Sequence, residues 1–258
     1  MLAAWGSVTV TGPLGGGNRN SVLELRRGRE RLVARRSRRP PASLDWEVGL
    51  LDHLARHGLR VPSVIPARDG RRHVDGVVVL SWLDGHPPRP GDWPAVAAAL
   101  RKLHAVTAGW PQRPGFASTE ELITAHRSGD ADLSIMPPDA VADCRAAWRR
   151  LAGTPMAVVH GDPGPANIRM TGAGAGLLDW DEARVDYTDL DLADLPASDS
   201  RSGDARSGDA PAAYLPPARL AAAHAAVRAW EAASGWRIEP SYARRQLAEL
   251  RSGPGTHP

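Results

Sequence analysis

Short apolar runs separated by turns fill the first part of the chain. Runs rich in Val and Leu occur at 5–12, 21–28 and 30–36, with glycines between them. Such runs, bounded by Gly, are typical of β-strands. Two further apolar runs lie at 61–68 and 73–83. The pattern predicts a five-stranded antiparallel sheet.

A helical pattern interrupts the predicted strands after the third run. Four apolar positions, three or four residues apart, share one face of this helix: Leu44, Val48, Leu51 and Leu54. Ser43 is expected to be its N-cap, because a hydroxyl can accept a hydrogen bond from the first free amides. Gly58 is expected to end it. The sheet should therefore contain one inserted helix.

Alanine-rich helical patterns replace the strands after Asp84 and Gly85, where a turn breaks the chain. Four helices are expected at or near prolines: 94–106, 138–152, 217–233 and 239–252. This change predicts an N-terminal lobe over residues 1–84 and a mainly helical C-terminal lobe over residues 85–258, an α+β fold. The segment 197–211 contains RSGDA twice and is expected to form a surface loop.

The charge balance argues against a nucleic-acid partner. The chain has 32 basic and 29 acidic residues among 258, a net charge of +3. The basic run from Arg26 to Arg39 would otherwise suggest such a partner. However, Lys102 is the only lysine, arginine and alanine are frequent throughout, as GC-rich coding produces, and few aromatic residues accompany the run. We expect no nucleic acid among the partners.

Hydropathy and cysteine content limit other classes of protein. A hydrophobic fraction of 42% predicts a folded core. The chain lacks the run of about 18 apolar residues that a membrane helix requires, and the segment Met1 to Val10 lacks a secretion signal. We therefore expect a cytoplasmic protein without a membrane partner. The single cysteine, Cys144, excludes an intramolecular disulfide and should serve packing. The sequence leaves the oligomeric state open.

The segment from Val158 to Ala183, VVHGDPGPANIRMTGAGAGLLDWDEA, gathers polar residues around a glycine-rich turn. NIRM and GLLDW flank TGAGAG, which predicts a hairpin centred on Ala173. In that register Asn167 and Asp179 face each other, six residues from the centre on either side. Opposed side chains in a hairpin lie about 5 Å apart, so the two could share a hard divalent cation. The hairpin therefore predicts a metal site.

A third candidate, Asp162, precedes Asn167 by five residues, in a loop kept irregular by Pro163, Gly164 and Pro165. A carboxylate beside a metal site can orient a hydroxyl and accept its proton, which is the division of roles in phosphoryl transfer. Each of these residues alone could instead build a turn or cap a strand. Their combination with the hairpin favours a functional site.

Two motifs in this segment resemble those of a known family. HGDPGPAN, from His160 to Asn167, is similar to the HGDxxxxN catalytic loop of the aminoglycoside phosphotransferase and choline kinase group, small-molecule relatives of the protein kinases. LLDWDEA, from Leu177 to Ala183, resembles the metal-binding segment of that group. The likeness extends over most of the chain and implies a bilobal protein-kinase-like fold.

The resemblance also implies a role for each matching residue. Asp162 would be the catalytic base, and Asn167 and Asp179 would hold Mg²⁺. His160 matches the family histidine, which is expected to brace the loop from within. Asp191, in the DLA that follows, matches an aspartate that supports the catalytic loop.

The N-terminal lobe matches an ATP site of the same family. In LGGGNRNSVLEL the backbone N–H groups of Gly16 and Gly17 would approach the phosphates, and Asn20 aligns with the asparagine that commonly follows. Taken alone, these glycines could form an ordinary hairpin turn. In VVVLSWLDG the backbone groups of Ser81 and Leu83 would hydrogen-bond the adenine edge.

The chain departs from the family at the phosphate-binding lysine, because this lobe contains none. Arg35 occupies the matching strand position and can grip phosphate oxygens in a bidentate manner. Glu47, on the inserted helix, is its expected ion-pair partner. A register slip of one residue would substitute Arg36, which points to the other face of the strand. Arg35 could also be a solvated strand charge.

These features predict an ATP-dependent O-phosphotransferase that uses Mg²⁺ and acts on a small hydroxylated molecule, such as an aminoglycoside, an amino alcohol or an amino sugar. The alternative is a nucleotide-binding pseudokinase or regulatory module without transfer activity, motivated by the missing lysine. Four acidic residues could bind a cationic acceptor or organise the loop: Asp181, Glu182, Asp186 and Asp189. The sequence does not identify the acceptor or distinguish ATP from GTP.

Overall fold

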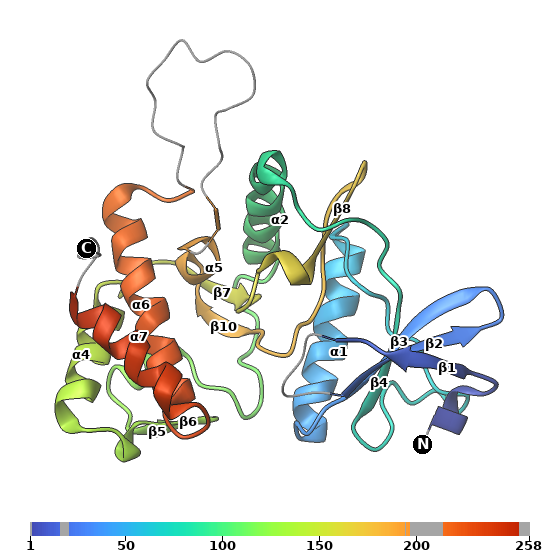
Figure 1. Cartoon of the computed structure of the whole chain (residues 1–258), viewed down its shortest axis with the longest axis horizontal. Coiled ribbons are helices and arrows are strands. Elements are labelled where there is room, and N and C mark those ends of the chain that lie inside the picture. The colour runs from blue at the N-terminus through green and yellow to red at the C-terminus, as the bar shows by residue number, and fades with distance from the viewer. Residues whose placement is uncertain (1, 16–20, 194, 197–213, 253–258) are drawn as a thin grey trace, which may run out of the picture. The chain divides into compact units, whose positions relative to one another are not determined.

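The computed structural model describes residues 2–15, 21–193, 195–196 and 214–252 (Figure 1). Three residues of the predicted phosphate loop, Gly16, Gly17 and Asn20, lie outside this part of the chain. The loop predicted at 197–211 also lies outside it.

The chain divides into two compact units. The first unit comprises Met1–Pro88 and Pro165–Trp180, and the second comprises Arg89–Gly164 and Asp181–Pro258. The glycine-rich hairpin thus groups with the N-terminal segment, although it follows the second unit's first helices in the sequence. The lobe boundary after residue 84 stays a prediction.

The sheet of the first unit has four antiparallel strands in the order β1-β2-β3-β4 (Figure 1). They span Thr9–Pro13, Ser21–Arg27, Glu30–Arg36 and Val77–Ser81, and a short 3₁₀ helix, Leu2–Trp5, precedes them. Eight apolar side chains form a buried core on this sheet: Trp5, Leu25, Leu32, Ala34, Ala67, Val74, Val77 and Val79. The alternating pattern of β2 and β3 thus supplies one buried face, as expected.

The prediction of a fifth strand at 61–68 was wrong. Among the described residues, this segment contributes only an isolated bridge, Val64 to Leu80, and a few backbone hydrogen bonds to β4. Pro62 and Pro66 carry no amide hydrogen, so a regular ladder cannot form there. The segment therefore lies along β4 without extending the sheet.

Helix α1, Pro41–Arg56, is the inserted helix. Its predicted apolar face is buried, with Leu44, Val48, Leu51 and Leu54 all inside. The N-cap is Pro40 and not Ser43, which lies buried in the first turn. Proline at the first helical position is already suited to a helix start, because its ring fixes φ and the missing amide hydrogen has no helical partner there.

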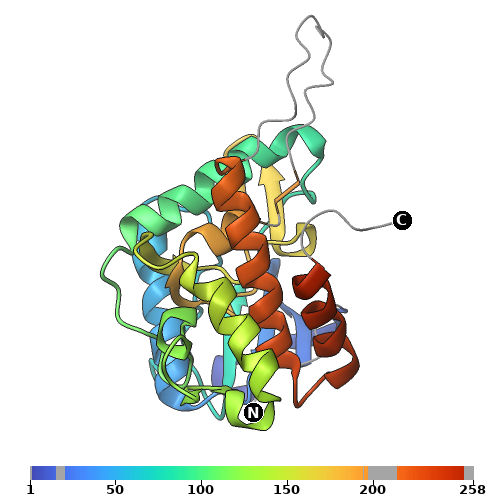
Figure 2. The same ribbon diagram turned by 90° about the vertical axis from the view of Figure 1, so that its left-hand side faces the viewer.

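The second unit is mainly helical. Figure 2 shows α6, in orange, running beside α4 and α7, and these pairs are in contact. A two-stranded antiparallel ladder, β7 with β10, lies among the helices. The elements of this unit are η2 Pro90–Asp92, α2 Trp93–Val106, α3 Thr119–Leu122, β5 Arg127–Ser128, β6 Ala131–Asp132, η3 Leu133–Ile135, α4 Pro138–Arg149, β7 Met156–Val159, β10 Arg184–Tyr187, α5 Asp189–Ala193, α6 Pro217–Gly235 and α7 Pro240–Ser252. Each of the four predicted helices has a counterpart here.

Small side chains allow α6 to pack closely. Its buried face consists mostly of alanines, and the Trp148 side chain of α4 donates from Nε1 to the carbonyl of Ala226 at 3.2 Å. Within the described residues, no helix has the length and hydropathy needed to cross a membrane.

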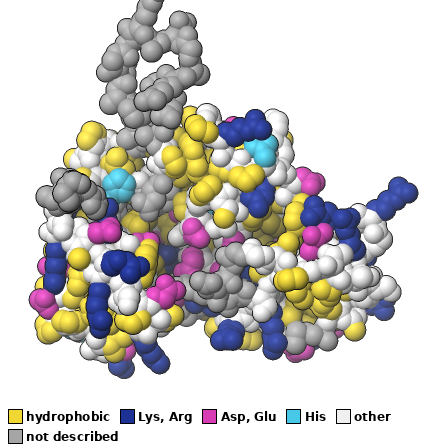
Figure 3. Space-filling model, in the orientation of Figure 1, with side chains coloured by type: hydrophobic (Ala, Val, Ile, Leu, Met, Phe, Trp, Pro, Cys, Tyr) yellow, Lys and Arg dark blue, Asp and Glu magenta, His cyan; other side chains and the backbone are white. Residues whose placement is uncertain are grey.

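Charges of opposite sign are mixed on the surface. Arginines of the basic run pair with carboxylates: Arg27 with Glu30 and Arg31 with Glu24 near the surface, and Arg35 with Glu47 in the interior. On the face drawn in Figure 3, Lys and Arg side chains are interspersed with acidic ones. The high arginine content thus includes many local ion pairs.

We predict that Cys144 is protected from thiol reagents in the native protein. It is fully buried between helices, and burial raises the pKa of its thiol to about 12. Because the thiolate is the reactive form, labelling with a chromogenic disulfide at pH 8 should be slow until the second unit opens. Labelling in denaturant provides the reference rate. Rapid stoichiometric labelling of the native protein would contradict this burial.

Candidate active site

The loop after β7 places Asp162 at the surface. His160 is completely buried, whereas Asp162, two residues later, is exposed. The Asp162 amide donates to Nδ1 of His160 at 3.4 Å. His160 therefore supports the loop from inside, as expected, and leaves the Asp162 side chain facing outward.

The side chain of Asp191 binds the backbone of this loop. Its carboxylate accepts hydrogen bonds from the amides of His160, at 2.8 Å, and Gly161, at 3.0 Å. His104, on α2, donates to the same carboxylate from Nε2 at 2.8 Å. Burial alone would raise the pKa of this carboxyl group, but the bond from His104 and those from the loop hold the pKa below its ordinary value. The expected supporting role of Asp191 is confirmed.

Gly161 is required by a close approach of two backbone segments. Its φ of +83° lies in the left-handed region, and a Cβ atom there would meet the carbonyl oxygen of Glu182 at 2.6 Å. A side chain at this position would therefore push Asp162 and Glu182 apart. The glycine of HGD thus brings the loop against the segment that follows the metal motif.

The hairpin forms, but its register differs from the prediction by one residue. β8 (Ile168–Thr171) pairs with β9 (Gly174–Leu177) through a two-residue turn, with Ile168 opposite Leu177. The amide of Leu178 donates to the carbonyl of Asn167 at 2.9 Å. Asn167 therefore faces Leu178, and the prediction that it faces Asp179 was wrong. A two-residue turn is the favoured length for a hairpin, which moves the centre away from Ala173.

Asp179 directly follows Leu178, the residue that faces Asn167, at the open end of the hairpin. Its φ of +60° is unusual for a residue other than glycine, and its side chain is 48% exposed. β9 ends at Leu177, so Asp179 lies just beyond the ladder. Backbone strain of this kind is common at ligand-binding positions. A half-buried amide and a half-exposed carboxylate thus end the two strands.

Arg35 and Glu47 form a buried ion pair within the first unit. Arg35 donates from NH2 to Oε1 of Glu47, and the two residues are only 4% and 1% exposed. NH1 of Arg35 lies 3.8 Å from Oδ1 of Asp179. Arg36 is exposed on the opposite face of β3. The guanidinium thus joins α1 to the end of the hairpin that carries Asp179.

The segment after β4 bears the residues proposed for adenine. The amide of Ser81 donates to the carbonyl of Ser63 at 2.8 Å, so only the carbonyl of Ser81 remains for a purine edge. Trp82 packs under the guanidinium of Arg31, 3.5 Å from its ring centroid, which fits a packing role. The contacts of Ser81 and Leu83 with a nucleotide stay predictions.

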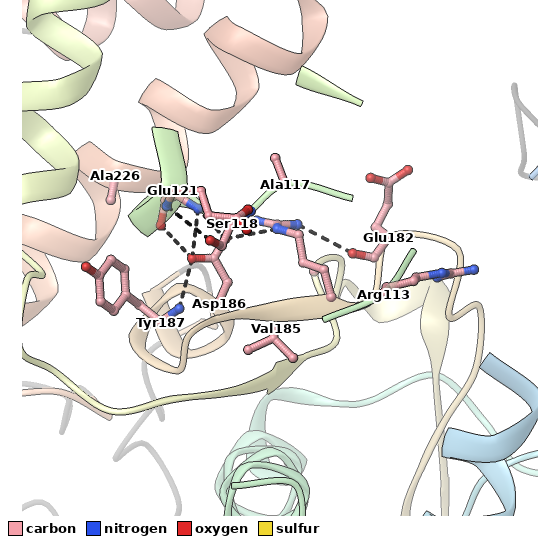
Figure 4. Close-up of polar contacts among 12 residues, drawn as sticks. Arg113, Ala117, Ser118, Glu121, Glu182, Val185, Asp186, Tyr187 and Ala226 are labelled. Atoms are coloured by element: carbon pink, nitrogen blue, oxygen red, sulfur yellow. Dashed lines mark hydrogen bonds and ion pairs between the residues drawn. The ribbon is translucent and has the colours of Figure 1, made fainter. Parts of the chain in front are cut away.

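Two of the four acidic residues after the metal motif are committed to internal ion pairs. Asp189 pairs with Arg219, and Asp186 pairs with Arg184. Asp186 also accepts hydrogen bonds from Thr119 and from the amide of Tyr187 (Figure 4). Burial raises the pKa of Asp186, and the charge of Arg184 only partly offsets that rise. Asp186 and Asp189 therefore organise the chain that follows the metal-binding segment.

The other two acidic residues, Asp181 and Glu182, lie in a segment whose backbone carbonyls accept hydrogen bonds from arginine side chains. Arg113, almost fully buried, donates from NH1 to the carbonyls of Asp181 and Ala183 at 3.2 Å. Arg184 reaches the carbonyl of Glu182, whose carboxylate points away from this network in Figure 4. Glu182 is thus fixed by its main chain while its side chain is directed elsewhere.

Sequence reasoning missed His104 and Arg113. A histidine on the apolar face of an alanine-rich helix needs a buried partner, and this signal could have identified His104. Arg113 offered no such signal, because its acceptors are backbone carbonyls about seventy residues further along the chain.

Comparison with known proteins identifies the family. A model described as "Phosphotransferase enzyme family" matches residues 11–240. The chain belongs to this phosphotransferase family. The homoserine kinase of Gluconacetobacter diazotrophicus is 31% identical over 194 residues, which is 66% of this chain and 58% of that protein. The chain thus spans less than two thirds of the length of this curated relative.

Solved structures show the same fold at low sequence identity. The amicoumacin kinase hAmiN, solved in complex with AMP-PNP, Ca²⁺ and Ami, has a TM-score of 0.65 and 13% identity, and the match covers 95% of this chain and 88% of that one. A microcompartment-associated aminopropanol kinase has a TM-score of 0.60 and 20% identity, with 95% and 90% covered. The α+β fold expected for this phosphotransferase is confirmed.

We predict that Asp191→Asn loosens the second unit of this phosphotransferase. An asparagine offers one acceptor oxygen to three donors, so buried donors lose partners and the free energy of unfolding should fall by about 3 kcal/mol. The loss should shrink below about pH 4, because the lowered pKa of Asp191 makes its contribution present above the unfolded value and lost as pH falls. Denaturant unfolding at pH 7 measures the loss of stability, and the same experiment at pH 3.5 measures how far that loss shrinks.

The control is Asp139→Asn, which removes one exposed carboxylate from a surface pair with Arg251. That change should have little effect on the free energy of unfolding, because exposed ion pairs contribute little. Equal losses in the two variants would show that Asp191 contributes no more than a surface pair.

Proposed function

We propose that the protein is an ATP-dependent kinase that transfers the γ-phosphoryl group to a hydroxyl of a small molecule. The observation that carries this proposal is the exposed Asp162 on a loop whose two preceding amides are fixed by the buried carboxylate of Asp191. Membership of the phosphotransferase family supports it. The homoserine kinases and the small-molecule kinases of similar fold point the same way.

Asp162 is the proposed base. Its carboxylate would accept the proton of the acceptor hydroxyl while the hydroxyl oxygen bonds to the γ-phosphorus. The bond from that phosphorus to the β–γ bridging oxygen breaks, and ADP leaves with its electron pair. The loop contributes by holding Asp162 in one position, since positioning supplies much of the rate enhancement in phosphoryl transfer.

Asn167 and Asp179 fit the proposed Mg²⁺ site by their chemistry. Amide and carboxylate oxygens are hard donors that suit this ion, and Asp179 has a left-handed φ just beyond the end of the ladder. When bound, the ion would neutralise phosphate charge. Asp162 precedes Asn167 by only five residues, so the chain itself keeps them within about 18 Å.

Arg35 is the proposed substitute for the missing lysine. Glu47 fixes its guanidinium, and a guanidinium can bind phosphate oxygens in a bidentate manner. Gly16, Gly17 and Asn20 are proposed to cover the phosphates. The Ser81 carbonyl and the Leu83 amide are proposed to bind the adenine edge, which leaves the amide of Ser81 to its bond with Ser63.

The proposed acceptor is a small amino alcohol. Homoserine, the substrate named for the curated relatives, and aminopropanol, named for a structural relative, both combine an amine with a hydroxyl. Asp181 and Glu182, in a segment held by its backbone carbonyls, are the acidic residues proposed to bind the amine. An acceptor panel of homoserine, aminopropanol, choline, amino sugars and aminoglycosides, coupled to ADP release, tests this choice.

A binding module without transfer activity is the second candidate, motivated by arginine at position 35. It predicts that ATP with Mg²⁺ raises the melting temperature while no acceptor on the panel yields ADP. The kinase predicts both effects. Absence of any stabilisation by ATP would count against both functions.

We predict that Asp162→Asn abolishes turnover. The amide cannot accept the hydroxyl proton, so kcat should fall at least about a thousandfold, within the range measured for loss of a general base. Because Asp162 is exposed, the melting temperature and the Kd for ATP should stay near the parent values. Asp139→Asn in the same unit provides the matched control with full activity. Undiminished kcat in Asp162→Asn would rule out the proposed base.

We predict that Arg35→Lys weakens ATP binding but preserves the fold. Lysine keeps the charge opposite the buried Glu47, but its side chain is shorter and its donors lie on one nitrogen, so it does not reproduce the bidentate contact of a planar fork. The Kd for ATP, measured by calorimetry, should rise roughly tenfold. Arg36→Lys, on the exposed face of the same strand, should leave the Kd unchanged. An unchanged Kd in Arg35→Lys would remove Arg35 from the phosphate site.

A further inference from the structure

Arg60 joins three segments of the first unit through one guanidinium group. It follows α1 by a few residues and is half-buried. NH1 donates to the carbonyl of Arg169 at 2.9 Å and to that of Gly174 at 3.0 Å. NH2 donates to the carbonyl of Asp84 at 2.8 Å. One side chain thus ties both strands of the hairpin to the segment after β4.

The main chain of Arg60 strengthens the same attachment. Its carbonyl accepts from the amide of Leu177 at 2.9 Å, and Arg60 forms a parallel bridge with Gly176. A second bridge, between His86 and Met170, ties the hairpin to the chain beyond Asp84. The hairpin is therefore anchored along its length to two segments that come more than eighty residues earlier.

Gly176 leaves the space that this arrangement needs. A Cβ atom at this position would lie 3.0 Å from NH1 of Arg60 and 2.7 Å from Cδ2 of Leu83. Both distances are too short, so any side chain would displace the guanidinium or Leu83. The glycine on β9 is thus complementary to the arginine.

The joined segments carry the two ends of the proposed nucleotide site. The hairpin ends in Asn167 and Asp179, the proposed metal ligands. Asp84 directly follows Ser81 to Leu83, the proposed adenine contacts. A guanidinium is planar and always charged, and its N–H groups point in fixed directions, so it sets the spacing between the carbonyls it binds.

We propose that Arg60 is a positioning residue that fixes the metal-binding hairpin against the adenine-binding segment, so that base and phosphates of one nucleotide are bound together. This rests on the proposed kinase function. Ser81, one of the two proposed adenine contacts, is also held by the β3–β4 ladder, where it pairs with Leu32. Loss of Arg60 should therefore affect the phosphate and metal end more than the base.

The test compares two ligands on three variants. Calorimetry measures the Kd of adenosine, which reports the base alone, and of ATP with Mg²⁺, which reports both ends. Arg60→Ala removes the donors, and Gly176→Ala places a methyl group against both the guanidinium and the Leu83 side chain while keeping the charge. Arg71→Ala is the control, because Arg71 is exposed in the same unit and pairs with a neighbouring surface aspartate.

We expect the Kd for ATP with Mg²⁺ to rise at least about tenfold in Arg60→Ala and Gly176→Ala, while the Kd for adenosine changes by less than about threefold. Arg71→Ala should change neither. The Mg²⁺ concentration at half-maximal ATP binding should rise in the same two variants. A merely structural role would lower the melting temperature without altering the ratio of the two Kd values.

An unchanged ratio in folded Arg60→Ala would overturn the role of Arg60 while leaving the kinase intact. If Arg60→Ala does not fold, Gly176→Ala and Arg60→Lys, which retains part of the donor set, decide the matter by the same ratio. A parent protein that binds adenosine but not ATP with Mg²⁺ would overturn both proposals. Transfer activity of the parent, measured separately, distinguishes the two failures.

Discussion

The buried carboxylate of Asp191 is the interaction on which the proposed catalytic loop depends. Asp162 is exposed, so its position follows from the backbone that carries it. That backbone is fixed where the amides of His160 and Gly161 meet two oxygens of one carboxylate. A charged acceptor in a buried setting binds such amides strongly, and His104 supplies a further donor. The proposed base can therefore lie in solvent while its backbone stays fixed.

Periodic patterns predicted the frame of the fold well, because periodicity reflects burial directly. The buried face of α1 and the four long helices of the second unit follow the apolar spacing. The ion pair between Arg35 and Glu47 also followed, since strand alternation allowed only one of two neighbouring arginines to point inward. The sequence alone was sufficient to predict features that depend on the periodicity of a helix or a strand.

The predictions failed in two places: where a shift of one residue changed the register of the hairpin, and where prolines lack the amide hydrogen that a strand ladder needs. The centre of a glycine-rich turn is ambiguous by one position, and a one-residue slip exchanges the faces of a strand. Asn167 therefore faces Leu178, and Asp179, the next residue, has a left-handed φ beyond the end of the ladder. At 61–68, apolar content suggested a strand, but its prolines prevent a full ladder. The apolar pattern thus predicts which side chains are buried better than it predicts which backbone groups form hydrogen bonds.

Arginine links distant segments at the site in a way that composition cannot reveal. Arg60 and Arg113 each bind backbone carbonyls that lie far along the chain, and every residue type offers the same carbonyl. The partners of Arg60 and Arg113 therefore cannot be inferred from the sequence. A guanidinium can donate to several acceptors at once, whereas an ammonium acts from one point. In a chain with a single lysine, arginine at position 35 extends this use, since its fork contacts Glu47 and approaches Asp179 together.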